Sequence, residues 1–197
     1  MAFKGLAMDS SSEKNYARIF VAFPVPFSNA EELKIIHQQN SFLDGIRWTP
    51  SQNLHVTIFF LGEVVEANIS PIINAISAVT NKAKPFTIQF EKIKLAGKLK
   101  RGGMIWAQFY KNDSYFNLSK NIYHGVEPYL IIQPVFKDPI PHVTLARFKG
   151  ETDSAKINLS FQDTFTLPEI NYCELWRTIQ TKEGVVYKSL GRFDFEK

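Results

Sequence analysis

A four-residue pattern, His-Val-Thr followed by an apolar residue, occurs twice in the sequence, at residues 55–58 and 142–145. Each copy lies in a run of mainly apolar residues, which is typical of a buried β-strand. Residues two apart on a strand point to the same face of a sheet, so each histidine stands beside its threonine while the apolar neighbours face the other way. The recurrence of this pattern predicts two structurally related halves.

The rest of the chain predicts strands interleaved with helices. Short extended segments and hairpin-type turns, such as the one at 182–184, favour antiparallel pairing and an α+β fold over a doubly wound parallel sheet. Gly62 is expected to end the strand that carries the first triplet. Strands are expected at 17–23, 54–61, 86–95, 104–110, 140–148, 171–178 and 185–193, with a short extended piece ending at 48, and helices at 30–39, from 68 or 70 to about 79, and at 114–123.

Composition says little about function, but it predicts a folded protein and argues against one that spans a membrane. The chain has 197 residues, 45% of them hydrophobic, which is enough for a core in one domain or in two closely packed lobes. We expect residues 1–15 to be a flexible tail and residues 16–197 to form a single bilobal domain. The single Cys173 favours a reducing, cytoplasmic location, and no apolar run is long enough to predict a membrane span.

The charge of the chain is mildly positive. A formal charge of +4 and a pI of about 9.1 favour an anionic partner without requiring one. Several basic residues fall in one glycine-containing segment, which is either a basic rim of a binding site or a solvated hairpin. These residues are Lys92, Lys94, Lys98, Lys100 and Arg101.

Two histidines and two threonines brought together by adjacent strands would suit attack on a phosphodiester. One neutral imidazole can take a proton from water while a protonated imidazole gives one to the departing oxygen. Histidine suits both tasks because its ordinary pKa lies near neutrality. The hydroxyls of Thr57 and Thr144 can donate to phosphate oxygens. The candidate catalytic residues are therefore His55, Thr57, His142 and Thr144.

Other interpretations of the histidines are less favoured. Chance placement of His and Thr on strands is disfavoured by the repeated strand context. His37 and His124 have no threonine at the second following position, so both are interpreted as structural or exposed. A metal enzyme is disfavoured because no further His, Cys or carboxylate recurs in the same frame, and we expect neither a metal nor a cofactor.

The sequence resembles the two-histidine (2H) phosphoesterase superfamily, and within it the bacterial and archaeal RNA 2′,3′-cyclic phosphodiesterases, also called 2′-5′ RNA ligases. The segments that carry the resemblance are 18–24 (RIFVAFP), 47–63 (RWTPSQNLHVTIFFLGE) and 141–147 (PHVTLAR). Residues 97–106 match more loosely. The resemblance covers residues 17 to 193.

This resemblance implies a bilobal, pseudo-twofold fold with two antiparallel-sheet lobes, helices outside and a central cleft. It implies metal-independent conversion of RNA 2′,3′-cyclic phosphate ends to 2′-phosphomonoesters, with reversible 2′-5′ ligation in some relatives. It also implies that His55 protonates the leaving 3′ oxygen and that His142 activates water, although a pseudo-symmetric pair can exchange these roles.

Three further residues are candidates for substrate binding. Arg147 matches a basic position that follows the second motif, and its alternative is a surface salt bridge. Phe20 and Trp48 could stack on bases, and their alternative is ordinary core packing. The adjacent Phe59 and Phe60 are assigned to packing. The expected partner is an RNA end or a related nucleotide, bound by a monomer that does not associate with membranes.

Two other functions remain open. The same catalytic residues could act on a 2′-5′ oligoadenylate or on a small cyclic nucleotide, because specificity resides in loops. A non-catalytic RNA-end-binding module is the other alternative, and it is disfavoured because both triplets are intact.

Overall fold

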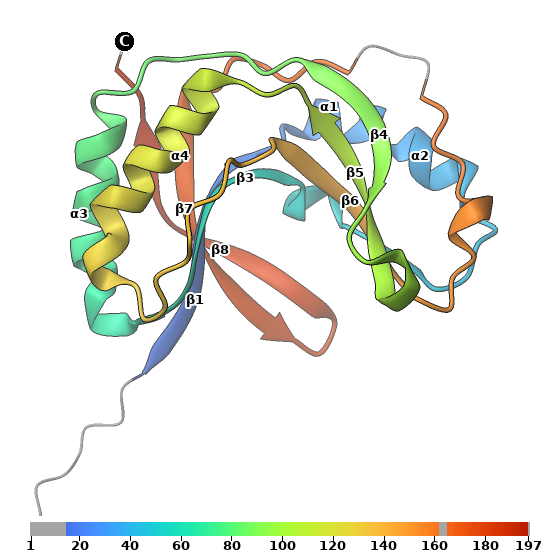
Figure 1. The fold of residues 1–197 in the computed structure, drawn as a ribbon, viewed down its shortest axis with the longest axis horizontal. Helices are drawn as coiled ribbons and strands as arrows, with labels where there is room; N and C mark the ends of the chain where they lie inside the picture. The colour runs from blue at the N-terminus through green and yellow to red at the C-terminus, as the bar shows by residue number, and fades with distance from the viewer. Residues whose placement is uncertain (1–14, 162–164, 197) are drawn as a thin grey trace, which may run out of the picture.

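A computed structural model describes residues 15–161 and 165–196. In these residues, strands and α-helices alternate along the chain (Figure 1). The strands are β1 (Tyr16–Pro24), β2 (Ile46–Trp48), β3 (His55–Val65), β4 (Phe90–Ala96), β5 (Gly102–Phe109), β6 (His142–Lys149), β7 (Tyr172–Thr181) and β8 (Gly184–Asp194). The helices are α1 (Phe27–Glu32), α2 (Lys34–Gln39), α3 (Ile69–Thr80) and α4 (Asp113–Val126). The predicted tail lies almost wholly outside the described residues.

All the strands belong to one antiparallel sheet in the order β4-β5-β6-β3-β1-β7-β8, with β2 added beside β6. The sheet narrows at its centre, where β3 and β6 pair only at Val56 and Val143. On one side of this neck lie β1, β3, β7 and β8 with α3 and α4, and on the other lie β2, β4, β5 and β6 with α1 and α2 (Figure 1). The predicted bilobal α+β class is confirmed.

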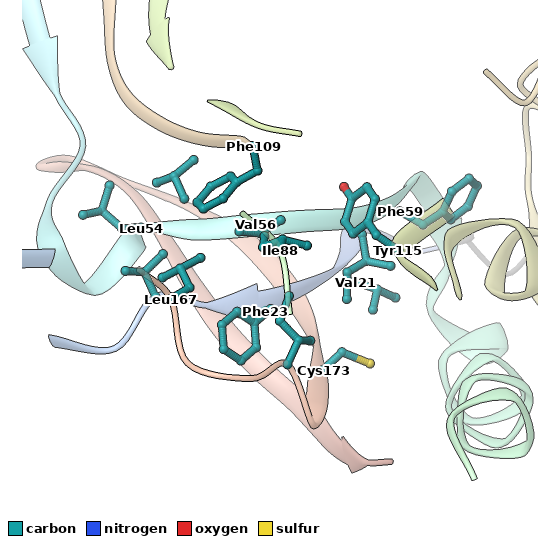
Figure 2. Packing of buried hydrophobic residues seen from close by; sticks show 14 of the residues in the cluster. Val21, Phe23, Leu54, Val56, Phe59, Ile88, Phe109, Tyr115, Leu167 and Cys173 are labelled. Carbon is teal, nitrogen blue, oxygen red and sulfur yellow. The ribbon is translucent and has the colours of Figure 1, made fainter. Parts of the chain in front are cut away.

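The hydrophobic core continues through both lobes. Figure 2 shows side chains from β1, β3, β5 and α4 packed together, among them Val56, Phe109 and Tyr115. Cys173 is part of this core, and burial raises the pKa of its thiol. Because Val56 and Val143 both face the core, the histidines and threonines that flank them in sequence face away from it.

Several predicted boundaries are wrong. The helix expected at 30–39 is two short helices that meet at Leu33, and the strand expected at 86–95 begins only at Phe90. Gly62 does not end β3, which continues to Val65. This glycine has φ of 76° and pairs with Ile19 next to a register shift, so it adapts the strand locally instead of terminating it. None of the helices in the described ranges is long and apolar enough to cross a membrane.

Candidate active site

The two His-Val-Thr triplets meet at the neck of the sheet. Each triplet occupies the first three positions of its strand, β3 or β6, and these strands run antiparallel with their central valines paired. His55 and Thr57 therefore lie beside His142 and Thr144 on the face opposite the core. The sequence predicted this convergence, and the β3–β6 pairing produces it.

The likeness of the two strands extends beyond the triplets. The first seven residues of β3 and β6 have the same order of buried, half-buried and exposed side chains. Both strands also have a register shift after the threonine, at Thr57 in β3 and at Thr144 in β6. One extra residue reverses the alternation of side chains, so Phe60 and Arg147 return to the face that carries the histidines. Phe60 and Arg147 are therefore structurally equivalent.

Hydrogen bonds from outside the strand pair satisfy the carbonyls at these irregularities. In β3, the hydroxyl of Tyr115 donates to the Thr57 carbonyl, and Ser119 Oγ donates to the Ile58 carbonyl at 2.7 Å. In β6, the backbone N–H of Thr49 donates to the Leu145 carbonyl at 2.8 Å. The backbone that carries both threonines is thus fixed from α4 and from the end of β2.

Both histidines are oriented in the same way. Nδ1 of His55 lies 2.7 Å from the carbonyl of Asn53, and Nδ1 of His142 lies 2.7 Å from the carbonyl of Ile140. A carbonyl only accepts, so each Nδ1 carries the hydrogen and each Nε2 is the atom left for proton transfer. Asn53 is itself held, because its side-chain amide donates to the Val185 carbonyl of β8 at 2.8 Å.

His55 is enclosed by aromatic rings. The ring centroids of Phe20, Tyr187 and Trp176 lie 5.0, 5.2 and 5.3 Å from that of His55. Burial lowers the pKa of His55 from 6.5 to about 4, with smaller lowering by the charges of the second histidine and of Arg147, while the bond to the Asn53 carbonyl raises it. His55 is therefore neutral near neutral pH in the free protein.

His142 has different surroundings. It stacks on Trp106 with ring centroids 3.7 Å apart and planes inclined by 20°. Burial lowers the pKa of His142 and the charge of Arg147 adds to this, while the bond to the Ile140 carbonyl raises it. An indole face attracts a cationic imidazole, so the stacked Trp106 gives the protonated form of His142 an electrostatic partner. The indole contact of His55, with Trp176, is instead T-shaped, with planes inclined by 63°.

The atoms available for catalysis form no hydrogen bonds with the described part of the protein. Among the described residues, neither the hydroxyls of Thr57 and Thr144 nor the Nε2 atoms of the histidines take part in a hydrogen bond. The described part of the chain also contains no group of three or more His, Cys, Asp or Glu side chains placed to hold a metal ion. Two proton carriers and two hydroxyl donors are therefore free to act on one bound group.

A groove of about 360 Å³ lies beside His55, because Phe20, Asn53 and Tyr187, which contact that histidine, belong to its lining. Its walls come from β1, from β2 and β6, and from the β7–β8 hairpin. Three exposed arginines line it, and their charge favours an anionic ligand. The lining residues are Arg18, Phe20, Arg47, Trp48, Thr49, Pro50, Asn53, Phe60, Arg147, Thr178, Gln180, Glu183, Gly184, Val185 and Tyr187.

The three predicted binding residues all line this groove, in different ways. Arg147 is exposed and its guanidinium contacts the Met104 sulfur at 2.9 Å, so it forms no surface salt bridge with a described carboxylate. Phe20 is only 2% exposed and acts as a wall behind His55. Trp48 is half-buried and stacks on His37. His124 lies in the last turn of α4, with Nδ1 4.0 Å from a carboxylate oxygen of Glu127.

Sequence reasoning missed three residues of the site. Phe60 was assigned to packing, yet it is 56% exposed and lines the groove. In a regular strand, buried and exposed residues alternate. Two successive apolar residues before Phe60, Ile58 and Phe59, are both buried and mark the irregularity that turns Phe60 outward. Trp106 and Asn53 act through cross-strand contacts, for which the sequence has no local signal.

Comparison with known proteins finds similarity to phosphoesterases. Residues 24–106 match the family model described as LigT-like phosphoesterase. A relative from Archaeoglobus fulgidus, named RNA 2′,3′-cyclic phosphodiesterase, is 27% identical over 90% of this chain and 99% of its own length.

Solved structures share the fold. The apo structure of E. coli LigT has a TM-score of 0.72 and 18% identity, covering 92% of this chain and 99% of that one. The structure of E. coli LigT complexed with 3′-AMP has a TM-score of 0.68 and 19% identity, covering 93% and 100%. The chain is therefore similar in sequence to LigT-like phosphoesterases over residues 24–106, and it shares the fold of E. coli LigT over most of its length.

Proposed function

We propose that this protein hydrolyses RNA 2′,3′-cyclic phosphate ends to 2′-phosphomonoesters. The observation that carries the proposal is the meeting of two His-Thr pairs across β3 and β6, with both Nε2 atoms and both hydroxyls free among the described residues. The name of the Archaeoglobus relative supports the reaction class, and the 3′-AMP complex of E. coli LigT supports a nucleotide as ligand.

The proposed reaction is an in-line displacement at phosphorus. One imidazole takes a proton from water through Nε2, and the water oxygen forms a new bond to phosphorus. The bond between phosphorus and the 3′ oxygen breaks, and the second imidazole delivers its Nε2 proton to that oxygen. The product keeps the phosphate on the 2′ oxygen. No step needs a metal ion.

The surroundings of the histidines favour roles opposite to those implied by the family resemblance. His55 lies among three aromatic rings and holds a proton poorly, which suits a general base. His142 stacks on Trp106, which stabilises its protonated form and suits a general acid. We therefore propose His55 as the base and His142 as the acid for hydrolysis.

Thr57, Thr144 and Arg147 would bind the reacting phosphate. The hydroxyls donate to its non-bridging oxygens and hold phosphorus between the two imidazoles. The guanidinium of Arg147 acts from the same face of the sheet, close enough for its charge to lower the pKa of both histidines. If an RNA 5′-hydroxyl replaced water, the same site would form a 2′-5′ linkage.

The pH dependence follows from the two histidines. The free enzyme needs neutral His55 and protonated His142, and burial lowers both pKa values below 6.5. We expect kcat/KM to be highest on the acid side of pH 6.5 and to fall at higher pH as His142 loses its proton. The maximum of kcat should lie at higher pH, because a bound phosphate anion favours the imidazolium. Steady-state kinetics across pH would measure both profiles, and a kcat/KM maximum above pH 6.5 would contradict the lowered pKa values of the two histidines.

Turnover itself is tested with an RNA oligonucleotide that ends in a 2′,3′-cyclic phosphate. We expect hydrolysis by the purified protein at the same rate with and without excess chelator, measured by chromatographic separation of substrate and product. Activity that is lost in chelator and restored by a divalent cation would replace the proposed mechanism with a metal-dependent one. Absence of any turnover would refute the proposed function.

A further inference from the structure

Two arginines of the groove face each other across a strand pair. Arg47 of β2 and Arg147 of β6 are direct partners in the antiparallel register, and both line the groove. Side chains at directly opposite positions of such a pair lie on the same face, with Cβ atoms roughly 4.5–5.5 Å apart. The two side chains therefore begin side by side on the groove wall, and the guanidinium of Arg147 reaches to the Met104 sulfur of β5 on the other side of β6.

Nothing described in the protein neutralises this pair. Neither arginine forms an ion pair among the described residues, and the one hydrogen bond of Arg147 goes to the sulfur of Met104, a weak acceptor. Glu183, the carboxylate among the lining residues, lies in the turn between β7 and β8. Like charges directly opposite on a sheet are destabilising, and a bound anion would remove that cost.

The two arginines lie at different distances from the candidate catalytic residues. Arg147 follows Thr144 by three residues on β6, and the register shift after Thr144 brings its side chain to the face that carries the histidines. Arg47 lies on β2, a short strand that pairs with β6 on the side opposite β5. Arg18 of β1 lines the same groove. The cationic surface thus continues from the reacting phosphate outward along the groove.

Aromatic side chains accompany these charges. Phe60 is exposed, and Tyr187 and Trp48 are half-buried beside it in the groove. Alternation of cationic and aromatic side chains is the arrangement that binds single-stranded nucleic acid, where bases stack and phosphates are neutralised. A single cyclic phosphate would not use the outer arginine.

We infer that Arg47, beside Arg147, forms a second phosphate site, which holds the internucleotide phosphate that precedes the terminal cyclic phosphate. The inference rests on the proposed function and narrows it: the substrate is an RNA strand of two or more nucleotides, in preference to a mononucleoside cyclic phosphate or another small cyclic nucleotide.

The test compares three substrates with the same terminal nucleoside: a mononucleoside 2′,3′-cyclic phosphate, a dinucleotide ending in that group, and the same dinucleotide with a neutral methylphosphonate linkage. The wild-type protein should have a kcat/KM about 10-fold to 100-fold higher for the charged dinucleotide than for the neutral one. In Arg47→Gln the ratio of kcat/KM for the charged dinucleotide to that for the neutral one should fall towards one. The change should appear mainly in KM, because the internucleotide phosphate has lost its guanidinium partner. A ratio in Arg47→Gln equal to that of the wild type would overturn the second site.

A control and a binding measurement complete the test. Arg101→Gln removes the same charge from an exposed turn that does not line the groove, so it should leave the ratio unchanged. An equal effect of both substitutions would indicate general attraction and overturn the local site. Without ligand, Arg47→Gln should melt no lower than the wild type, because it removes a repulsion; a lower melting temperature together with an unchanged ratio would assign Arg47 a structural role.

The same comparison can be made without turnover. Affinities for a dinucleotide with a 3′-terminal phosphate, charged or neutral at the internucleotide linkage, report on the second site alone. If the wild type binds the charged form more tightly and Arg47→Gln does not, the second site stands even where hydrolysis is absent and the proposed function fails. If both proteins bind the two forms equally, the second site is refuted whatever the hydrolysis assay shows.

Discussion

His55→Asn and His142→Asn are each expected to lower kcat for the cyclic phosphate by about 10²–10⁴-fold, the range that a general acid or base contributes. Asparagine keeps a donor near the position of Nδ1, so the bonds to the carbonyls of Asn53 and Ile140 can persist while the Nε2 atom is lost. The double variant should fall little below the single ones, because the two groups act in one step. Steady-state kinetics with direct detection of product would measure these losses.

His124→Asn is the matched control. His124 is exposed on α4 and lies in neither triplet, so its substitution should leave both kcat and the melting temperature unchanged. If either triplet variant retained wild-type turnover while remaining folded, the corresponding histidine would not take part in proton transfer.

Phe20→Ala is expected to lower the free energy of unfolding by about 3–5 kcal/mol, the usual cost of removing a buried phenylalanine side chain. Phe20 is 2% exposed, and it contacts His55, Phe60, Trp176 and Tyr187 in a small cluster on the cleft face of the sheet. Loss of the ring would admit water beside His55, so the pKa of that histidine should rise towards 6.5. Urea denaturation and NMR titration of the imidazole would measure the two effects.

Phe60→Ala separates packing from binding on the same face. Phe60 is 56% exposed, so its loss should change stability by no more than about 0.5 kcal/mol while raising KM. If Phe20→Ala and Phe60→Ala had the same free energy of unfolding, the side chain of Phe20 would not contribute to stability as its buried contacts indicate.

The sequence predicted the site because its main signal is local. Period-two alternation places each histidine beside its threonine, and the repeated triplet requires two equivalent strands. The paired valines of β3 and β6 then bring the four side chains together. Secondary structure was also predictable where apolar spacing is regular, as in α3, which begins at Ile69 and tolerates Pro71 in its first turn.

What the sequence did not predict depends on contacts between distant segments. The register shifts after Thr57 and Thr144 depend on neighbouring strands, and without them Phe60 would be assigned to the core face. Asn53 positions His55 through a bond to β8, from a residue far along the chain. Trp106 reaches His142 because β5 pairs with β6, which no local pattern encodes.

The identity of the product tests the central claim most directly. Complete hydrolysis of an RNA 2′,3′-cyclic phosphate end, followed by ³¹P NMR of the product against authentic 2′- and 3′-phosphomonoesters, determines which oxygen leaves. The proposed mechanism predicts the 2′-phosphomonoester alone, formed by the wild type and lost in both triplet variants. A 3′-phosphomonoester, or product that forms at the wild-type rate in His55→Asn or His142→Asn, would contradict it.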